Sequence, residues 1–122
     1  MVQIIIRHVS GARATEVDVV PIGEHRELIF GRARSAAVRF HPQQDPLVGR
    51  FHARVVPTGA SRGGFLISDL GSRNGTYLNG QRIDDAVTIR HGDRVSFGKE
   101  GPEVEFQVEG MAEFRGVEDG VS

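Results

Sequence analysis

Turn-forming residues interrupt the chain about every 8–12 positions, and this spacing limits the possible folds more than any other feature of the sequence. The segments between the turns are short and rich in Val, Ile and Phe, as at residues 2–6 and 53–56. Residues 16–20 alternate polar and apolar side chains, the period of a strand with one buried face. No window keeps the 3.6-residue apolar period of a helix. The sequence therefore predicts an all-β sandwich.

The chain has 122 residues, of which 39% are hydrophobic, enough for a single core. We expect one domain over residues 1–110 and an acidic tail, or the start of a linker, over residues 111–122. The sequence has no cysteine, which excludes disulfides and thiolate chemistry and makes the cytoplasm the expected compartment. The five histidines are scattered singly, so we expect no metal and no cofactor. No apolar run reaches the ~18 residues of a membrane span.

The charge of the chain is divided unevenly along its length. The formal net charge is −1, which argues against general binding to nucleic acid or membrane. Residues 1–99 carry 14 Lys and Arg against 9 Asp and Glu, net +5, whereas residues 100–122 carry one Arg against 7 acids, net −6. Either the tail is a solvated end, or it screens a cationic site in the body of the domain.

Residues 65–79 contain a dense set of turn formers between two apolar runs, which predicts a strand, an exposed loop and a second strand. Ser72, Arg73 and Asn74 lie in this loop. We expect them to present a hydroxyl, a guanidinium and a carboxamide at one edge of the sandwich. Donors held in this way suit an anion.

Four sequence blocks, taken together, resemble one family. They are Gly31-Arg32, the run from Arg50 to Ala53, the run from Asp69 to Gly80, and the run from Gly92 to Gly98. In order and spacing they are similar to the forkhead-associated (FHA) domain over residues 3–109. The resemblance implies a sandwich of about eleven mainly antiparallel strands whose loops bind a phosphothreonine peptide without catalysis. It also implies a threonine-phosphorylated partner, an upstream Ser/Thr kinase, and a place within a larger signalling protein.

The resemblance assigns roles to individual residues of this chain. Arg32 matches the arginine that binds phosphate, for which a planar guanidinium is well suited. Asn74 matches the asparagine that holds the peptide main chain, because its amide both donates and accepts. Arg73 takes a variable phosphate or peptide position. Arg50 lies beside the site, or else points outward into solvent. The residues expected to support the site without touching the ligand are Gly31, His52, Ser72, Gly75 and Thr76.

The chain departs from the family pattern at Gly49, where the resemblance implies a serine whose hydroxyl donates to the phosphate. Loss of such a hydrogen bond costs roughly 1.5–3 kcal/mol. The backbone N–H of Gly49 remains available, and Arg50 or Arg73 can compensate. In a second reading the backbone at residue 49 has rearranged to positive φ. The alternative function is a degenerate FHA domain that binds proteins independently of phosphate.

Other functional classes find little support in the sequence. Asp84 and Asp85 are adjacent in a turn and face different ways, and no Ser/His/Asp arrangement can be argued from spacing, so we expect no enzyme. Most aromatic residues lie within apolar runs, which leaves no visible stacking platform for nucleic-acid bases.

Overall fold

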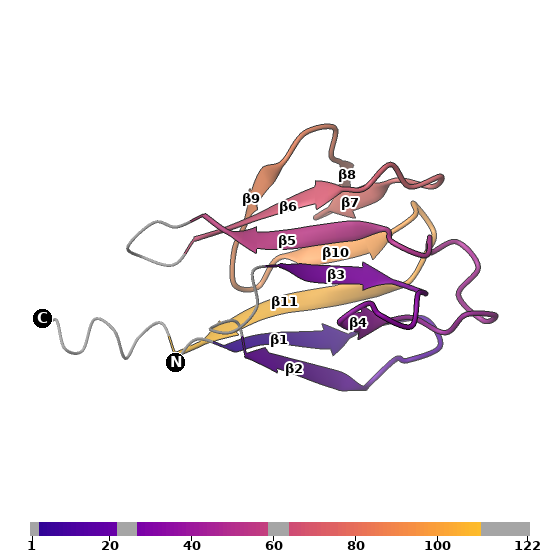
Figure 1. Ribbon diagram of the computed structural model, residues 1–122, viewed down its shortest axis with the longest axis horizontal. Helices are drawn as coiled ribbons and strands as arrows, with labels where there is room; N and C mark the ends of the chain where they lie inside the picture. Colours follow the sequence, from indigo (N-terminus) through magenta and orange to yellow (C-terminus); the bar gives the residue numbers. More distant parts are fainter. Residues whose placement is uncertain (1–2, 22–26, 59–63, 111–122) are drawn as a thin grey trace, which may run out of the picture.

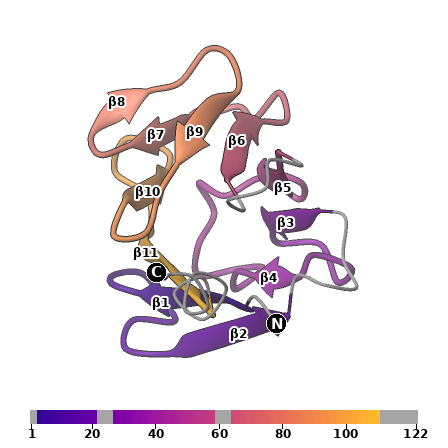
Figure 2. The same ribbon diagram turned by 90° about the vertical axis from the view of Figure 1, so that its left-hand side faces the viewer.

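The computed structural model describes residues 3–21, 27–58 and 64–110. In this part of the chain there are eleven strands and no helix, arranged as two sheets packed face to face (Figures 1 and 2). The predicted all-β sandwich of about eleven strands is confirmed. The predicted acidic tail at 111–122 and most of the glycine-rich turn after residue 58 lie outside the described residues.

The larger sheet has six strands in the order β2-β1-β11-β10-β7-β8, and its neighbouring strands are antiparallel. Its strands are β1 (Gln3–His8), β2 (Val17–Pro21), β7 (Thr76–Leu78), β8 (Gln81–Arg82), β10 (Arg94–Phe97) and β11 (Glu103–Glu109). The smaller sheet has five strands in the order β4-β3-β5-β6-β9. Its strands are β3 (Leu28–Gly31), β4 (Val38–Arg39), β5 (Ala53–Pro57), β6 (Phe65–Asp69) and β9 (Val87–Ile89).

Alternating burial explains why these segments form strands. In β1, Ile4 and Ile6 are fully buried whereas Arg7 is exposed, and in β11 Val104 and Phe106 are fully buried. The turn between β7 and β8 has positive φ at both central residues, 50° at Asn79 and 88° at Gly80. Positive φ at both positions is the conformation that an Asn-Gly hairpin favours.

A cluster of buried rings lies at the centre of the core. The ring of Phe97 lies 5.1 Å from Phe30, 4.8 Å from Phe40 and 5.3 Å from His52, measured between centroids. All four side chains are at most 1% exposed. Because His52 directly precedes β5, its packing in this cluster holds the end of the β4–β5 loop against the core.

The strand directions bring the loops β3–β4, β4–β5, β6–β7 and β10–β11 to the same end of the sandwich, on the right in Figure 1. The start of β1 and the end of β11 pair at the opposite end, where Gln3 faces Glu109. We call the end of the sandwich that carries these four loops the loop end. It is a set of irregular segments held by a rigid scaffold, the usual place for a binding site.

Candidate functional site

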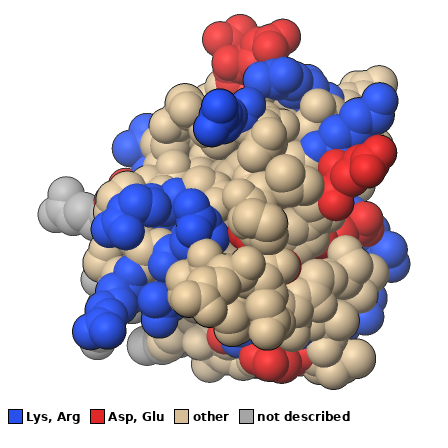
Figure 3. Space-filling view, turned by 90° about the vertical axis from the view of Figure 1, so that its right-hand side faces the viewer, with Lys and Arg blue, Asp and Glu red and all other residues tan. Residues whose placement is uncertain are grey.

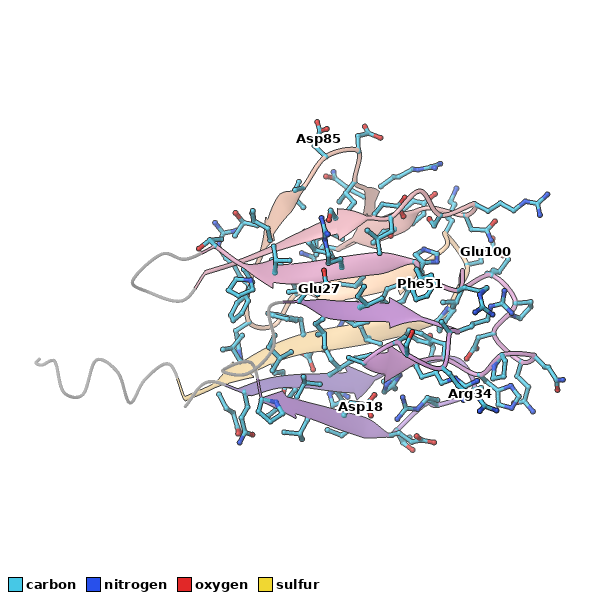
Figure 4. The ribbon with its side chains drawn as sticks, viewed as in Figure 1. Asp18, Glu27, Arg34, Phe51, Asp85 and Glu100 are labelled. Atoms are coloured by element: carbon cyan, nitrogen blue, oxygen red, sulfur yellow. The ribbon has the colours of Figure 1, made fainter. Side chains whose placement is uncertain are left out.

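Four arginines surround one pocket of about 220 Å³ at the loop end. We call it the arginine pocket, and it is lined by Arg32, Arg34, Arg39, Pro42 and Arg50. No carboxylate lines it. Figure 3 shows Lys and Arg side chains gathered on one side of this end of the molecule, and Figure 4 places Arg34 there. The pocket therefore offers several guanidinium groups to an anion.

Arg32 follows β3 directly and is half-buried. Its Nε donates to the carbonyl of Val48, and its Nη1 donates to the carbonyl of Pro42 at 2.8 Å. These two bonds fix the plane of the guanidinium. A guanidinium has five N–H groups, so three remain for a ligand.

Gly31 and the chain at Arg50 approach each other so closely that a side chain is excluded at Gly31. A Cβ at Gly31 would lie 2.0 Å from the carbonyl oxygen of Arg50, which accepts a hydrogen bond from the N–H of Ala33 at 3.0 Å. The N–H of Arg32 donates to the carbonyl of Gly49 at 2.9 Å. The β3–β4 and β4–β5 loops are thus joined through their backbones.

The ring of His52 connects two of the loops. Its Nδ1 accepts the N–H of Gly49 at 2.9 Å, so its Nε2 carries the proton and donates to the carbonyl of Gly75 at 2.8 Å. Burial lowers the pKa of His52, and the Gly75 carbonyl and the nearby Asp69 charge offset this only in part. The neutral ring is the form that fits both partners.

Asp69 organises the β6–β7 loop. Its Oδ2 accepts the N–H groups of Gly71 at 3.0 Å and Ser72 at 2.9 Å, and its Oδ1 accepts the hydroxyls of Ser72 at 2.5 Å and Thr76 at 2.7 Å. Burial would raise the pKa of Asp69, but the hydrogen bonds from Ser72 and Thr76 outweigh it and hold the pKa below its usual value. The hydroxyl oxygen of Ser72 also accepts the N–H of Gly75 at 2.9 Å.

Asn74 and Arg73 lie at the tip of the same loop. The Nδ2 of Asn74 donates to the carbonyl of Leu47 at 2.9 Å, next to the Val48 carbonyl that Arg32 holds. Arg32 and Asn74 therefore each donate a hydrogen bond to one of two adjacent carbonyl groups in the β4–β5 loop. The side chains of Arg73 and Arg50 are exposed and make no hydrogen bond or ion pair with any residue that the structure describes.

Two expectations about donors are wrong. The Ser72 hydroxyl is not presented at the edge, because it is held between Asp69 and Gly75. The N–H of Gly49 is not available to a ligand, because it donates to His52. The second reading of Gly49, a rearrangement to positive φ, is also wrong, since residue 49 is not among the glycines in that region.

Sequence reasoning missed three residues of this end. Arg34 and Arg39 line the arginine pocket because β4 returns beside β3, pairing Phe30 with Val38 in parallel. Asp69 was expected only as a turn former, although the sequence Asp-x-Gly-Ser is a signal for a side chain that accepts hydrogen bonds from the following backbone.

Across residues 3–21, 27–58 and 64–110, no group of three or more His, Asp or Glu side chains could hold a metal ion. The same described part of the chain contains no helix long and apolar enough to cross a membrane.

Comparisons with known proteins find two mycobacterial regulators. The chain is 44% identical over 55 residues to the glycogen accumulation regulator GarA of Mycolicibacterium smegmatis, covering 45% of this chain and 32% of GarA. It is 42% identical over 48 residues to the transcriptional regulatory protein EmbR of Mycobacterium tuberculosis, covering 39% of this chain and 12% of EmbR. The match thus spans less than a third of either relative's own length.

Solved structures share the fold. The FHA-1 domain of Mycobacterium tuberculosis Rv1747 superposes with a TM-score of 0.67 at 27% identity, over 88% of this chain and 96% of that one. A structure of EmbR in complex with a low-affinity phosphopeptide superposes with a TM-score of 0.66 at 24% identity, over 86% of this chain and 24% of that one. The profile of the FHA domain matches residues 28–98, more than half of the chain. The strands, the loop end and this match together show that the chain belongs to the FHA domain family.

Proposed function

We propose that this domain recognises threonine-phosphorylated peptides in Ser/Thr kinase signalling. The observation that carries the proposal is the arginine pocket, in which Arg32 keeps three N–H groups for a ligand while its plane is fixed by two carbonyls. A phosphate group supplies three strong acceptor oxygens and a charge of about −1.5 to −2 at pH 7. The relative EmbR has been solved with a phosphopeptide, which supports the same ligand class here.

In this proposal the phosphate lies against Arg32 and Arg50 in the arginine pocket, and Arg73 contributes charge from the rim. The peptide main chain runs past Asn74, whose carboxamide oxygen and second N–H are not used by the bond to Leu47. Gly31, His52, Ser72, Gly75 and Thr76 hold the loops and do not touch the ligand. The domain binds and does not catalyse, and we propose that residues 1–110 form one module of a longer protein.

The test begins with an oriented phosphopeptide library, followed by calorimetry on the best peptide and its unphosphorylated twin. Loss of charge-assisted hydrogen bonds worth roughly 1.5–3 kcal/mol each predicts that Arg32→Ala weakens binding by about a hundredfold or more. Arg54→Ala is the matched control, because Arg54 lies on β5 outside the pocket and only pairs with Glu27 at 3.5 Å.

Two outcomes contradict the proposal. If the phosphorylated and unphosphorylated peptides bind equally, the domain is a phosphate-independent interaction module, a function favoured by the missing hydroxyl and the engaged N–H at Gly49. If Arg32→Ala binds as well as Arg54→Ala, the phosphate lies elsewhere.

A further inference from the structure

We propose that the arginine pocket receives two neighbouring anionic groups, so that the preferred ligand carries a second anion beside its phosphothreonine. Arg34 and Arg39 bind this second group, which is a phosphate or a carboxylate. The inference rests on the proposed function and specifies the chemistry of the ligand next to the phosphate.

Four of the seven described arginines outside the pocket have acidic partners, whereas none of the four pocket arginines has one among the described residues. Arg7 pairs with Glu105, Arg54 with Glu27 and Arg94 with Glu103, and Arg13 pairs with two acids. By contrast, none of the arginines that line the pocket forms an ion pair with any residue in the described part of the chain. Four like charges are therefore gathered around one pocket without internal neutralisation.

A single phosphothreonine does not balance this charge. The phosphate group carries a charge of about −1.5 to −2 at pH 7, which neutralises two guanidinium groups at most. Arg32 is the best-oriented of the four, and Arg50 follows Gly49 in the adjoining segment, so these two meet the first phosphate. Arg34 and Arg39 then remain as an unneutralised pair, and a second anion next to the first removes their mutual repulsion.

Arg39 is held in place before any ligand arrives. Its Nε donates to the carbonyl of Arg32 at 3.2 Å, and its own carbonyl accepts Nη1 of Arg13 at 3.0 Å. Arg13 is in turn fixed by Asp18, whose Oδ1 and Oδ2 lie 2.9 and 2.8 Å from its guanidinium. The Nη groups of Arg39 make no hydrogen bond with any described residue, which leaves a planar fork facing the pocket.

Arg34 supplies a second and more adaptable cation. It lies in the β3–β4 loop at the loop end, where Figure 4 labels it, and it is exposed. It makes no hydrogen bond with the part of the chain that the structure describes, so its guanidinium can turn toward an anion in the pocket that it lines. One fixed and one adaptable arginine fit either a phosphate or a carboxylate.

The experiment uses a phosphothreonine peptide with otherwise uncharged flanks as the parent. In one series a glutamate is placed in turn at each neighbouring position, and in another a second phosphothreonine takes the same positions. At about 50 mM salt we expect at least one position to tighten binding by about five- to tenfold, and the gain to shrink at about 500 mM. The glutamate and phosphate arms show which source of the second charge is preferred.

The variants Arg34→Gln and Arg39→Gln should reduce that gain, whereas the matched variant Arg54→Gln should keep it. The inference is overturned if no position gains more than about twofold, or if the gain survives in both pocket variants. The inference is also overturned if a short single-stranded DNA of similar charge binds as tightly as the doubly anionic peptide, since the pocket then recognises negative charge without regard to the ligand.

The outcomes separate this inference from the proposed function. Binding of the parent peptide over its unphosphorylated twin, with no gain from a second anion, refutes only the inference. Equal binding of the parent peptide and its twin refutes both.

Discussion

Gly49→Ser tests the departure of this chain from its family most directly. Residue 49 does not have positive φ, and a Cβ there would lie 3.7 Å from Nδ1 of His52 and 4.0 Å from its Cα, which is ordinary contact. The substitution therefore fits without strain. A hydrogen bond to a charged group is worth roughly 1.5–3 kcal/mol, and exposure of the loop to water reduces it. We expect phosphothreonine peptides to bind about fivefold more tightly or better.

The same substitution should raise stability, because glycine loses more backbone entropy on folding than serine does. A gain of about 0.4–1 kcal/mol moves the melting temperature of a domain of this size upward by about 2–8 °C. Gly49→Ala is the matched control, since it adds the same Cβ without the hydroxyl. We expect it to raise the melting temperature and leave affinity unchanged.

Calorimetry and thermal melts on both variants decide between the possible errors. If Gly49→Ser and Gly49→Ala bind alike, a hydroxyl at residue 49 does not face the phosphate, and the site assignment around Arg32 must move. If either variant melts well below the wild type, the backbone at residue 49 is not in an ordinary conformation and the structural reasoning fails.

Three further predictions concern the loop end. Burial lowers the pKa of His52, so the neutral ring stabilises the fold fully above about pH 6.5, and this stabilisation is lost as the pH falls through the folded pKa. NMR titration should show the ring of His52 protonating below about pH 6.5, and an apparent pKa above that value contradicts the prediction. Asp69→Asn removes a charged acceptor of four hydrogen bonds, so it should lower the free energy of unfolding by about 1–3 kcal/mol and weaken peptide binding. An unchanged midpoint of urea unfolding would show that Asp69 does not organise the loop. Phosphothreonine peptides should bind more tightly than their phosphoserine twins, because we expect the threonine methyl group to pack in a small apolar pocket near Asn74. Equal affinities in calorimetry argue for a purely electrostatic clamp.

Strands were predictable from sequence because burial in this domain alternates along the chain. The ends of the strands were harder to place, and β1 shows why. The sequence predicted a strand at residues 2–6 from their β-branched side chains, whereas the structure extends β1 to His8. His8 is buried because its Nε2 lies 2.9 Å from Oδ2 of Asp18 on the neighbouring strand. No local pattern reveals that a partner ten residues along the chain makes a histidine suitable for the core.

The candidate site divides in a similar way. Arg32, Asn74 and His52 were found because they stand in blocks whose spacing resembles the family. Arg34 and Arg39 stand outside those blocks, and they reach the same pocket only because β4 lies parallel to β3. That pairing is a tertiary contact between two very short segments, and neither propensity nor periodicity encodes it.

The ligand-free geometry indicates that this end of the domain is preorganised. Arg32 and Asn74 hold the adjacent carbonyls of Val48 and Leu47, while His52 fixes the N–H of Gly49, so three side chains immobilise one stretch of the β4–β5 loop. Each of the first two still has unused polar groups, because a guanidinium has five N–H groups and a carboxamide has two together with its oxygen. A ligand can therefore add hydrogen bonds without breaking those already formed. Since ordering an exposed side chain on binding costs about 0.5–1.5 kcal/mol, side chains fixed beforehand convert more of each new contact into affinity.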